Sequence, residues 1–247
     1  MFWLIVLTTS LISAVLLYSQ RFKTGSGLTG NSLVQISYIS IGILSTVAII
    51  GILNQVTAET LLIQQSVAIL LKRLILVSIF ITTLGVLLHS LSLLVVTKKH
   101  SKIIEYIHLH ISHYMIYIGG ISTILMIGYV DLLSHNVNPQ GLPFLAPFLG
   151  ILIGFCCAIS IIWSGFVLVT LIVSWISSMV FLQSIPDMYV SFFLFLSEPY
   201  ASASIVAILT ANAVLTVHIL ANFSSTRYRN VSRAFYPSGH RKKHNSH

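Results

Sequence analysis

Residues 144–182 read FLAPFLGILIGFCCAISIIWSGFVLVTLIVSWISSMVFL and contain no charged residue. One transmembrane helix needs about 20 apolar residues, so this run is too long for a single span. We place a break near Trp163-Ser164-Gly165, although no polar loop marks it. The run then predicts two consecutive transmembrane helices, at 144–163 and 166–182.

Similar apolar runs follow one another from Met1 to Phe223. Hydrophobic residues make up 56% of the chain and charged residues only 7%, whereas a soluble domain carries about 25% charged residues. With so few charges, the chain is not expected to cover a water-facing surface. We therefore predict an all-α integral membrane protein, a single domain over 1–223 with seven transmembrane helices, at 2–19, 32–53, 74–97, 111–133, 144–163, 166–182 and 201–223.

Four segments outside these spans carry their own signals. Residues 54–71 alternate Gln and Glu with apolar side chains, which predicts an interfacial amphipathic helix at about 56–71. Lys102–His110 is expected to lead as helix into the fourth span. Asn, Pro and Gly in 134–143 predict a turn, and 224–247 is a polar, basic tail.

Basic residues outnumber acidic ones, with 13 Lys and Arg against 5 Asp and Glu and a net charge of +8. They cluster at span ends and in the tail, which is typical of charges that set membrane topology and not of a nucleic-acid-binding surface. If the seven successive spans cross the membrane in alternating directions, every Lys and Arg except Lys72 and Arg73 lies on the same side of the membrane. The positive-inside rule then predicts an outer N-terminus and an inner C-terminus.

The first span opens as Met-Phe-Trp-Leu-Ile-Val with no basic residue before it. A secretory signal or an Arg-rich transit peptide begins differently, so we expect 2–19 to be a retained span. Such a hydrophobic chain without an import signal is typical of a protein encoded in an organelle or a bacterium. We expect a multi-pass protein of the mitochondrial inner membrane or of a bacterial cytoplasmic membrane.

Ionisable residues within spans are often functional, and here they are few: His89, His113, Asp131 and His218. Paired histidines on facing helices can ligate a b-type haem. His89, His218 and one of His108, His110 and His113 are the candidate haem ligands, with hydrogen-bonded structural histidines as the alternative. We identify no catalytic or metal-ligating set, and adjacent Cys156 and Cys157 are poorly placed for a disulfide.

Five segments between about 113 and 223 form a recognisable series. They are Gly128-Tyr-Val-Asp-Leu-Leu-Ser-His135, Asn138-Pro139 with Pro143, Ser160-Ile-Ile-Trp163, Phe181-Leu-Gln183 with Tyr189, and Tyr200-Ala-Ser202. In this region the chain resembles, in divergent form, subunit III of cytochrome c oxidase. That family pairs a Gly near a span end with a His seven residues later, and then has Asn-Pro and Pro before a span ending Ser-Ile-x-Trp. Leu-Gln, Tyr and a helix opening Tyr-Gly-Ser follow.

The chain also departs from that family. Ser122 stands where the family has a buried Glu, and Ala213 and Thr216 stand near the family's paired His. The final Trp-rich helix of the family has no counterpart, while 2–19 is an additional helix. With one helix gained and one lost, the sidedness that the resemblance implies agrees with the sidedness predicted from charge.

The resemblance implies a non-catalytic supporting subunit of a multi-subunit respiratory electron-transport complex. Such a subunit binds neither haem nor copper, packs beside the haem-copper subunit, and holds lipid in a cleft between helix groups. Two other functions are left open by the residues. One is a b-haem-binding membrane anchor of a quinone-linked complex, and the other is a membrane carrier or channel.

Overall fold

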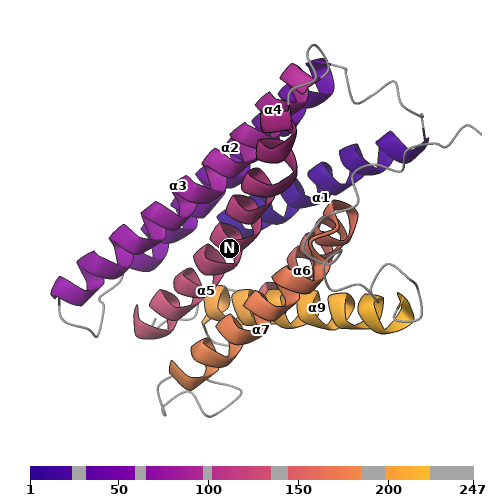
Figure 1. Ribbon diagram of the computed structural model, residues 1–247. Coiled ribbons are helices and arrows are strands. Elements are labelled where there is room, and N and C mark those ends of the chain that lie inside the picture. Colours follow the sequence, from indigo (N-terminus) through magenta and orange to yellow (C-terminus); the bar gives the residue numbers. More distant parts are fainter. Residues whose placement is uncertain (24–31, 59–64, 97–101, 135–143, 185–197, 223–247) are drawn as a thin grey trace, which may run out of the picture.

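The computed structural model describes residues 1–23, 32–58, 65–96, 102–134, 144–184 and 198–222. Within these ranges every regular element is a helix (Figure 1). The helices are α1 (Phe2–Lys23), α2 (Ser32–Ala58), α3 (Gln65–Val96), α4 (Lys102–Tyr106), a π-helical turn (Ile107–Ile111), α5 (Ser112–Ser134), α6 (Leu145–Ser164), α7 (Val167–Ser184) and α9 (Pro199–Asn222).

In the described ranges, five helices are long and apolar enough to cross a membrane. These segments are Ile36–Thr57, Ile69–Ser92, Ser112–Leu133, Leu145–Ser164 and Pro199–Asn222. The other two predicted spans correspond to shorter apolar helices, Phe2–Leu17 and Val167–Gln183. The predicted all-α class is confirmed for the described residues, and five of the helices have the length and composition needed to span a membrane.

The predicted break in the charge-free run is confirmed at Gly165. This residue has a φ of 83°, in the left-handed region that glycine adopts without a steric penalty. Its backbone N–H donates to the carbonyl oxygens of Ile161 and Ile162, at 3.1 and 3.3 Å. The left-handed residue ends α6, and α7 starts two residues later at Val167.

The predicted interfacial helix at 56–71 is wrong as a separate element. Helix α2 continues through Ala58, and the residues from Gln65 onward form the first turns of α3. Lys72 and Arg73 lie within α3 at exposed positions and do not precede it. Between Gln65 and Gly85 there is no Gly or Pro to end a helix, and Gln, Leu, Lys and Arg are strong helix formers. Residues 59–64 lie outside the described residues.

The expected helical lead into the fourth span is confirmed with one irregularity. Helix α4 passes through the π-helical turn Ile107–Ile111 directly into α5. Single π-helical turns within α-helices are frequent at functional sites. Of the predicted turn at 134–143, Ser134 is the last residue of α5, and 135–143 lie outside the described residues, as does the basic tail at 224–247.

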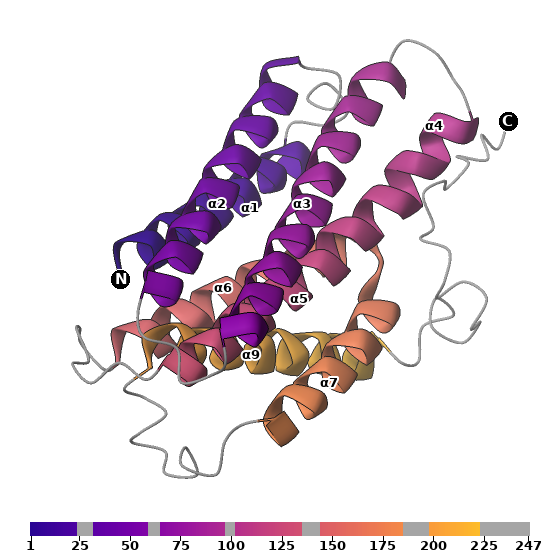
Figure 2. The ribbon, with the colours of Figure 1, turned by 90° about the vertical axis from the view of Figure 1, so that its left-hand side faces the viewer.

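Two groups of helices form the bundle. Helices α1, α2, α3 and α5 each pack against the next, while α6 and α7 both contact α9. Figure 2 shows α2, α3 and α5 roughly aligned, with α9 inclined to them. The two groups meet where α1 contacts α6 and α5 contacts α9. A cavity between them is therefore bordered by helices from both ends of the chain.

Small residues allow α6 and α9 to approach closely. A Cβ added to Gly150 would lie 2.5 Å from the carbonyl oxygen of Ala203, and one added to Gly154 would overlap the carbonyl of Ala207. Gly150-Ile-Leu-Ile-Gly154 is a Gly-x-x-x-Gly sequence, which permits such approach in membranes. The structure identifies α9 as its partner.

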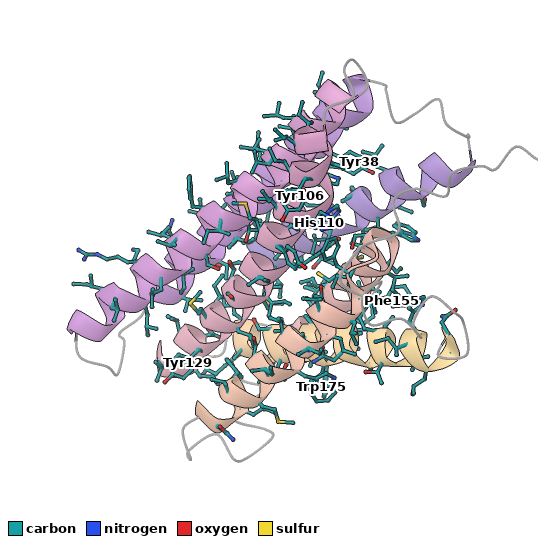
Figure 3. All side chains as sticks on the ribbon, in the orientation of Figure 1. Tyr38, Tyr106, His110, Tyr129, Phe155 and Trp175 are labelled. Carbon is teal, nitrogen blue, oxygen red and sulfur yellow. The ribbon has the colours of Figure 1, made fainter. Side chains whose placement is uncertain are left out.

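The outward faces of several helices are apolar. Val77 and Phe80 on α3 are exposed, as are Phe155 on α6 and Trp175 and Ile176 on α7. Phe155 and Trp175 are labelled in Figure 3. Exposing such an extensive apolar surface to water is energetically unfavourable, so these faces are suited to contact with lipid tails or partner helices.

Candidate functional site

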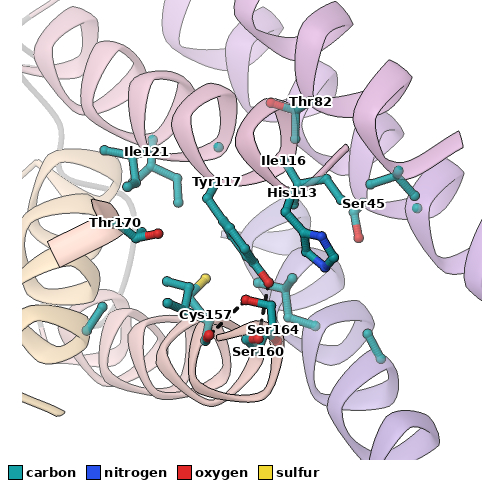
Figure 4. A pocket seen from close by; sticks show the side chains of 18 of the residues that line it. Ser45, Thr82, His113, Ile116, Tyr117, Ile121, Cys157, Ser160, Ser164 and Thr170 are labelled. Carbon is teal, nitrogen blue, oxygen red and sulfur yellow. Dashed lines mark hydrogen bonds between the residues drawn. The ribbon is translucent and has the colours of Figure 1, made fainter. Parts of the chain in front are cut away.

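A cavity of about 330 Å³ lies inside the bundle, between the two helix groups. All of α1, α2, α3, α5, α6, α7 and α9 contribute to its wall, and no Asp, Glu, Lys or Arg is among the lining residues. Figure 4 shows His113 and Tyr117 extending from α5 into it, with Ser160 and Ser164 of α6 opposite. The cavity is a concave site bordered by helices of both groups and is therefore the candidate functional site.

The lining residues of α3 show how far the cavity extends. His89 and Ile79 both line it from α3, and ten residues of helix separate them by about 15 Å. Hydroxyl side chains occur along this length, since Thr82 and Thr83 line the cavity near Ile79 and Ser90 lines it next to His89. The site is thus elongated, and its two lining histidines, His89 and His113, lie together at one end.

Hydroxyl groups in the middle of the cavity wall bond within the protein. Thr46 of α2 and Thr83 of α3 share a hydrogen bond of 2.9 Å. Each also bonds a carbonyl one turn earlier in its own helix, as does Thr82. Because the single hydrogen of each hydroxyl is engaged within the protein, these three groups offer few donors to the interior of the cavity.

Three imidazole rings pack together where His89 and His113 line the cavity. The rings of His89 and His108 are stacked with their centroids 4.3 Å apart. His113 meets His89 edge to face at 4.7 Å and stacks on Phe166 at 5.2 Å. The sequence predicted that His89 could face one of His108, His110 and His113, and the packing of α3 against the start of α5 places His89, His108 and His113 side by side.

The π-helical turn explains how His108 and His113 reach the same cluster. Residues five apart in an ordinary α-helix point in different directions, whereas the i→i+5 spacing of a π-helix aligns them. The turn Ile107–Ile111 lies between these two histidines, and their ring centroids are 5.9 Å apart. The periodicity of an α-helix, used to interpret the sequence, does not reveal this pairing.

Hydrogen bonds fix the orientation of His108. Its Nδ1 lies 3.0 Å from Ser92 Oγ and 3.2 Å from the carbonyl oxygen of His89. Ser92 Oγ donates to that same carbonyl at 2.9 Å, and a carbonyl only accepts. The consistent assignment places the proton on Nδ1 of His108, from which it is shared between the hydroxyl and the carbonyl.

The packing of the histidine rings can be compared with the geometry that a bis-imidazole haem requires. A bis-imidazole haem places the porphyrin between its two axial rings, and direct stacking of His89 on His108 leaves no such gap. His110 lies apart from this stack, with its ring 4.9 Å from Tyr106. His218 is on α9 and does not line the cavity.

The two cysteines and the side chains that could ligate a metal are the remaining polar candidates. Cys156 and Cys157 are free thiols on α6, and Cys157 contributes to the cavity wall. In the part of the chain that the structure describes, no three His, Cys, Asp or Glu side chains are grouped to hold a metal ion.

Asp131 is buried where α5 meets the start of α9. Its Oδ2 accepts backbone hydrogen bonds from Tyr200 at 2.9 Å and Ala201 at 2.8 Å. The first N–H groups of a helix lack partners within the helix, and a carboxylate there also opposes the positive end of the helix dipole. Asp131, one of the few ionisable residues predicted to lie within a span, therefore caps α9, a helix far along the chain.

Gly128 packs at the same contact between α5 and α9. A Cβ on Gly128 would lie 2.9 Å from Cβ of Ser204, so α5 at Gly128 and the start of α9 pack without a gap. The Tyr200 hydroxyl reaches further and donates to Gln55 Oε1 of α2.

No protein family, no curated protein and no solved structure matches this chain.

Proposed function

We propose that this chain is a non-catalytic supporting subunit of a haem-copper oxidase, similar to subunit III of cytochrome c oxidase. One observation carries the proposal. Gly128 and Asp131 belong to one matching segment, Tyr200 and Ala201 to another, and these segments are in direct contact. Chance matches scattered along a sequence have no reason to meet in space as a shared helix junction.

The chemistry of the bundle interior supports a role without catalysis. The carboxylate of Asp131 bonds backbone N–H groups, as a helix cap does. Transporters and proton pumps place ionisable side chains along their pathways, whereas the cavity wall of this chain has no charged residue. A supporting subunit that packs against a redox subunit needs a stable fold and a complementary surface more than it needs charged residues within the membrane.

The exposed apolar faces support assembly with other membrane helices. Val77 and Phe80 project from one side of the bundle, and Trp175 and Ile176 from α7. Within a membrane, such surfaces pack against lipid tails or the helices of another subunit. In this proposal the haem-copper subunit, which would hold the haem and copper, covers one of these faces, and lipids cover the rest.

The proposed topology has seven spans, with the N-terminus outside and the C-terminus inside. The five long helices and the two shorter apolar ones supply the seven. This orientation leaves only Lys72 and Arg73 among the basic residues on the outer side. The membrane would be the mitochondrial inner membrane or a bacterial cytoplasmic membrane.

Visible spectra and oxygen consumption test the non-catalytic role. The isolated chain is expected to show no haem absorption, and the assembled complex with His218→Ala is expected to consume oxygen at the wild-type rate. A b-type bis-histidine spectrum of the isolated chain that disappears in His89→Ala or His113→Ala would overturn the proposal in favour of a haem-binding anchor.

A further inference from the structure

Lys72 and Arg73 are adjacent basic residues on the surface of α3. Both are exposed, and both lie within Ile69–Ser92, the part of α3 that is long and apolar enough to cross a membrane. Arg73 is about 6 Å along the helix axis from Ile69. Burial of a cation in hydrocarbon is strongly unfavourable, so the two side chains extend toward the lipid headgroups at the nearer membrane surface.

The two cations have no acidic partner in the part of the chain that the structure describes. Asp131 and Glu198 are the acidic residues whose side chains are described there, and both are buried. The carboxylate of Asp131 bonds backbone N–H groups of α9. The positive charges of Lys72 and Arg73 therefore face outward, toward whatever surrounds the bundle.

Exposed apolar side chains continue from these cations along the same face of α3. Residues three or four apart in a helix lie one above the other, so Arg73 is followed by Val77 and Phe80. Lys72 is followed in the same way by Leu76. Leu76, Val77 and Phe80 are all exposed, and the helix rises about 10 Å from Arg73 to Phe80. One face of α3 thus carries positive charge at the membrane surface and apolar side chains below it.

The positive-inside rule accounts for the other basic residues but not for these two. In the proposed orientation, Lys72 and Arg73 are the basic residues on the outer side. A ligand of opposite charge gives them a role that topology does not. The orientation decides only in which leaflet that ligand lies, and the charge and apolar surface of this face are the same in either leaflet.

An acidic phospholipid has the complementary distribution of charge and apolar surface. Its phosphate lies at the membrane surface, where a guanidinium can donate two parallel hydrogen bonds to it. Its acyl chains lie beside the apolar side chains below. Basic residues near a membrane surface attract lipids of net negative charge, whereas the choline of phosphatidylcholine offsets the charge of its phosphate. Two adjacent cations therefore favour an acidic headgroup over a zwitterionic one.

We propose that Lys72 and Arg73 bind the headgroup of an acidic phospholipid whose acyl chains lie along Leu76, Val77 and Phe80. None of these five residues lines the cavity between the helix groups, so the site is on the outside of the bundle. The proposal concerns the chain itself and does not depend on the proposed function.

Native mass spectrometry of the full chain in mild detergent measures this binding. The apparent Kd values of phosphatidylglycerol and phosphatidylcholine with identical acyl chains are compared. Lys72→Gln with Arg73→Gln removes both charges and keeps long polar side chains at exposed positions. The matched control is Arg21→Gln with Lys23→Gln, which removes two positive charges from α1 and gives the same net charge.

The wild-type chain is expected to bind phosphatidylglycerol roughly tenfold more tightly than phosphatidylcholine, because two cations attract its net negative charge. Lys72→Gln with Arg73→Gln removes most of this difference, and the control variant keeps it. Inorganic phosphate at the same concentration does not displace the lipid, since it lacks the acyl chains.

Gly120→Leu distinguishes this site from the cavity. Gly120 lines the cavity, and a Cβ placed on it meets no atom within 4 Å, so the larger side chain fills that space and leaves the outer face of α3 unchanged. Loss of the preference for phosphatidylglycerol in Gly120→Leu would place the lipid in the cavity and overturn the proposal. Equal Kd values of the two lipids for the wild type, an undiminished preference in Lys72→Gln with Arg73→Gln, or displacement by inorganic phosphate would also overturn it.

Discussion

The carboxylate of Asp131 accepts a hydrogen bond of 2.9 Å from the backbone N–H of Tyr200, at the first turn of a helix that starts far along the chain. A second bond, from Ala201, is 2.8 Å long. Both residues are buried, so water does not compete for these bonds. One side chain of α5 therefore fixes where α9 begins and how it sits on the bundle.

Asp131→Ala is expected to destabilise the chain by about 1–2 kcal/mol, because two buried N–H groups and the helix dipole lose their partner. Asp131→Asn keeps an acceptor oxygen and is expected to lose less. The measurement is the denaturation midpoint of the purified chain in mixed micelles. An Asp131→Ala midpoint equal to that of the wild type would show that the cap does not stabilise α9.

Gly154→Val is expected to cost about 1–3 kcal/mol through overpacking against α9. Its control, Gly120→Ala, adds a methyl group into open space and removes the flexibility of glycine, so it should be neutral or stabilising by about 0.5–1 kcal/mol. Thermal unfolding of both variants in the same detergent makes the comparison. Equal effects of the two substitutions would contradict the close approach of α6 and α9.

Gly165→Val is expected to destabilise the junction between α6 and α7 by about 1–2 kcal/mol, because a side chain at a φ of 83° meets the following carbonyl. Gly165→Asn should be milder, since asparagine tolerates the left-handed conformation. Proteolysis of the chain in nanodiscs, followed by mass spectrometry, reports opening there. Resistance of Gly165→Val equal to that of the wild type would argue against a strained turn.

Single-cysteine labelling tests the proposed topology. With Cys156 and Cys157 replaced by Ala, a cysteine at Lys72 should react with a membrane-impermeant maleimide added to the outer side. A cysteine at Lys23 should react only after the inner side is made accessible. Labelling of both positions from the same side would rule out the seven-span orientation.

Much of the helix pattern could be predicted because apolar runs and their polar borders are local properties of the sequence. The break near Gly165 was correctly placed on length alone. The error at 56–71 arose because polar residues were interpreted as a change of environment, whereas α3 begins at Gln65 and continues through Lys72 and Arg73. Helical propensity there outweighs the local pattern of polarity.

The site was less predictable, since it depends on contacts between distant segments. The sequence marked Asp131 as an unusual residue but gave no sign of Tyr200 as its partner. It also named the histidines as a candidate haem pair, while a π-helical turn aligns His108 with His113 beside His89. The sequence Ile-His-Leu-His-Ile at 107–111 has no recognised signature of such a turn.

Affinity purification tests the central claim most directly. The full chain, tagged at its C-terminus, is isolated from its native membrane in mild detergent, and the copurifying proteins are identified alongside a visible spectrum. We predict stoichiometric recovery of a haem-copper oxidase subunit together with its haem absorption. Recovery of the chain alone in a stable form, or with a bis-histidine b-type haem of its own, would contradict the proposed function.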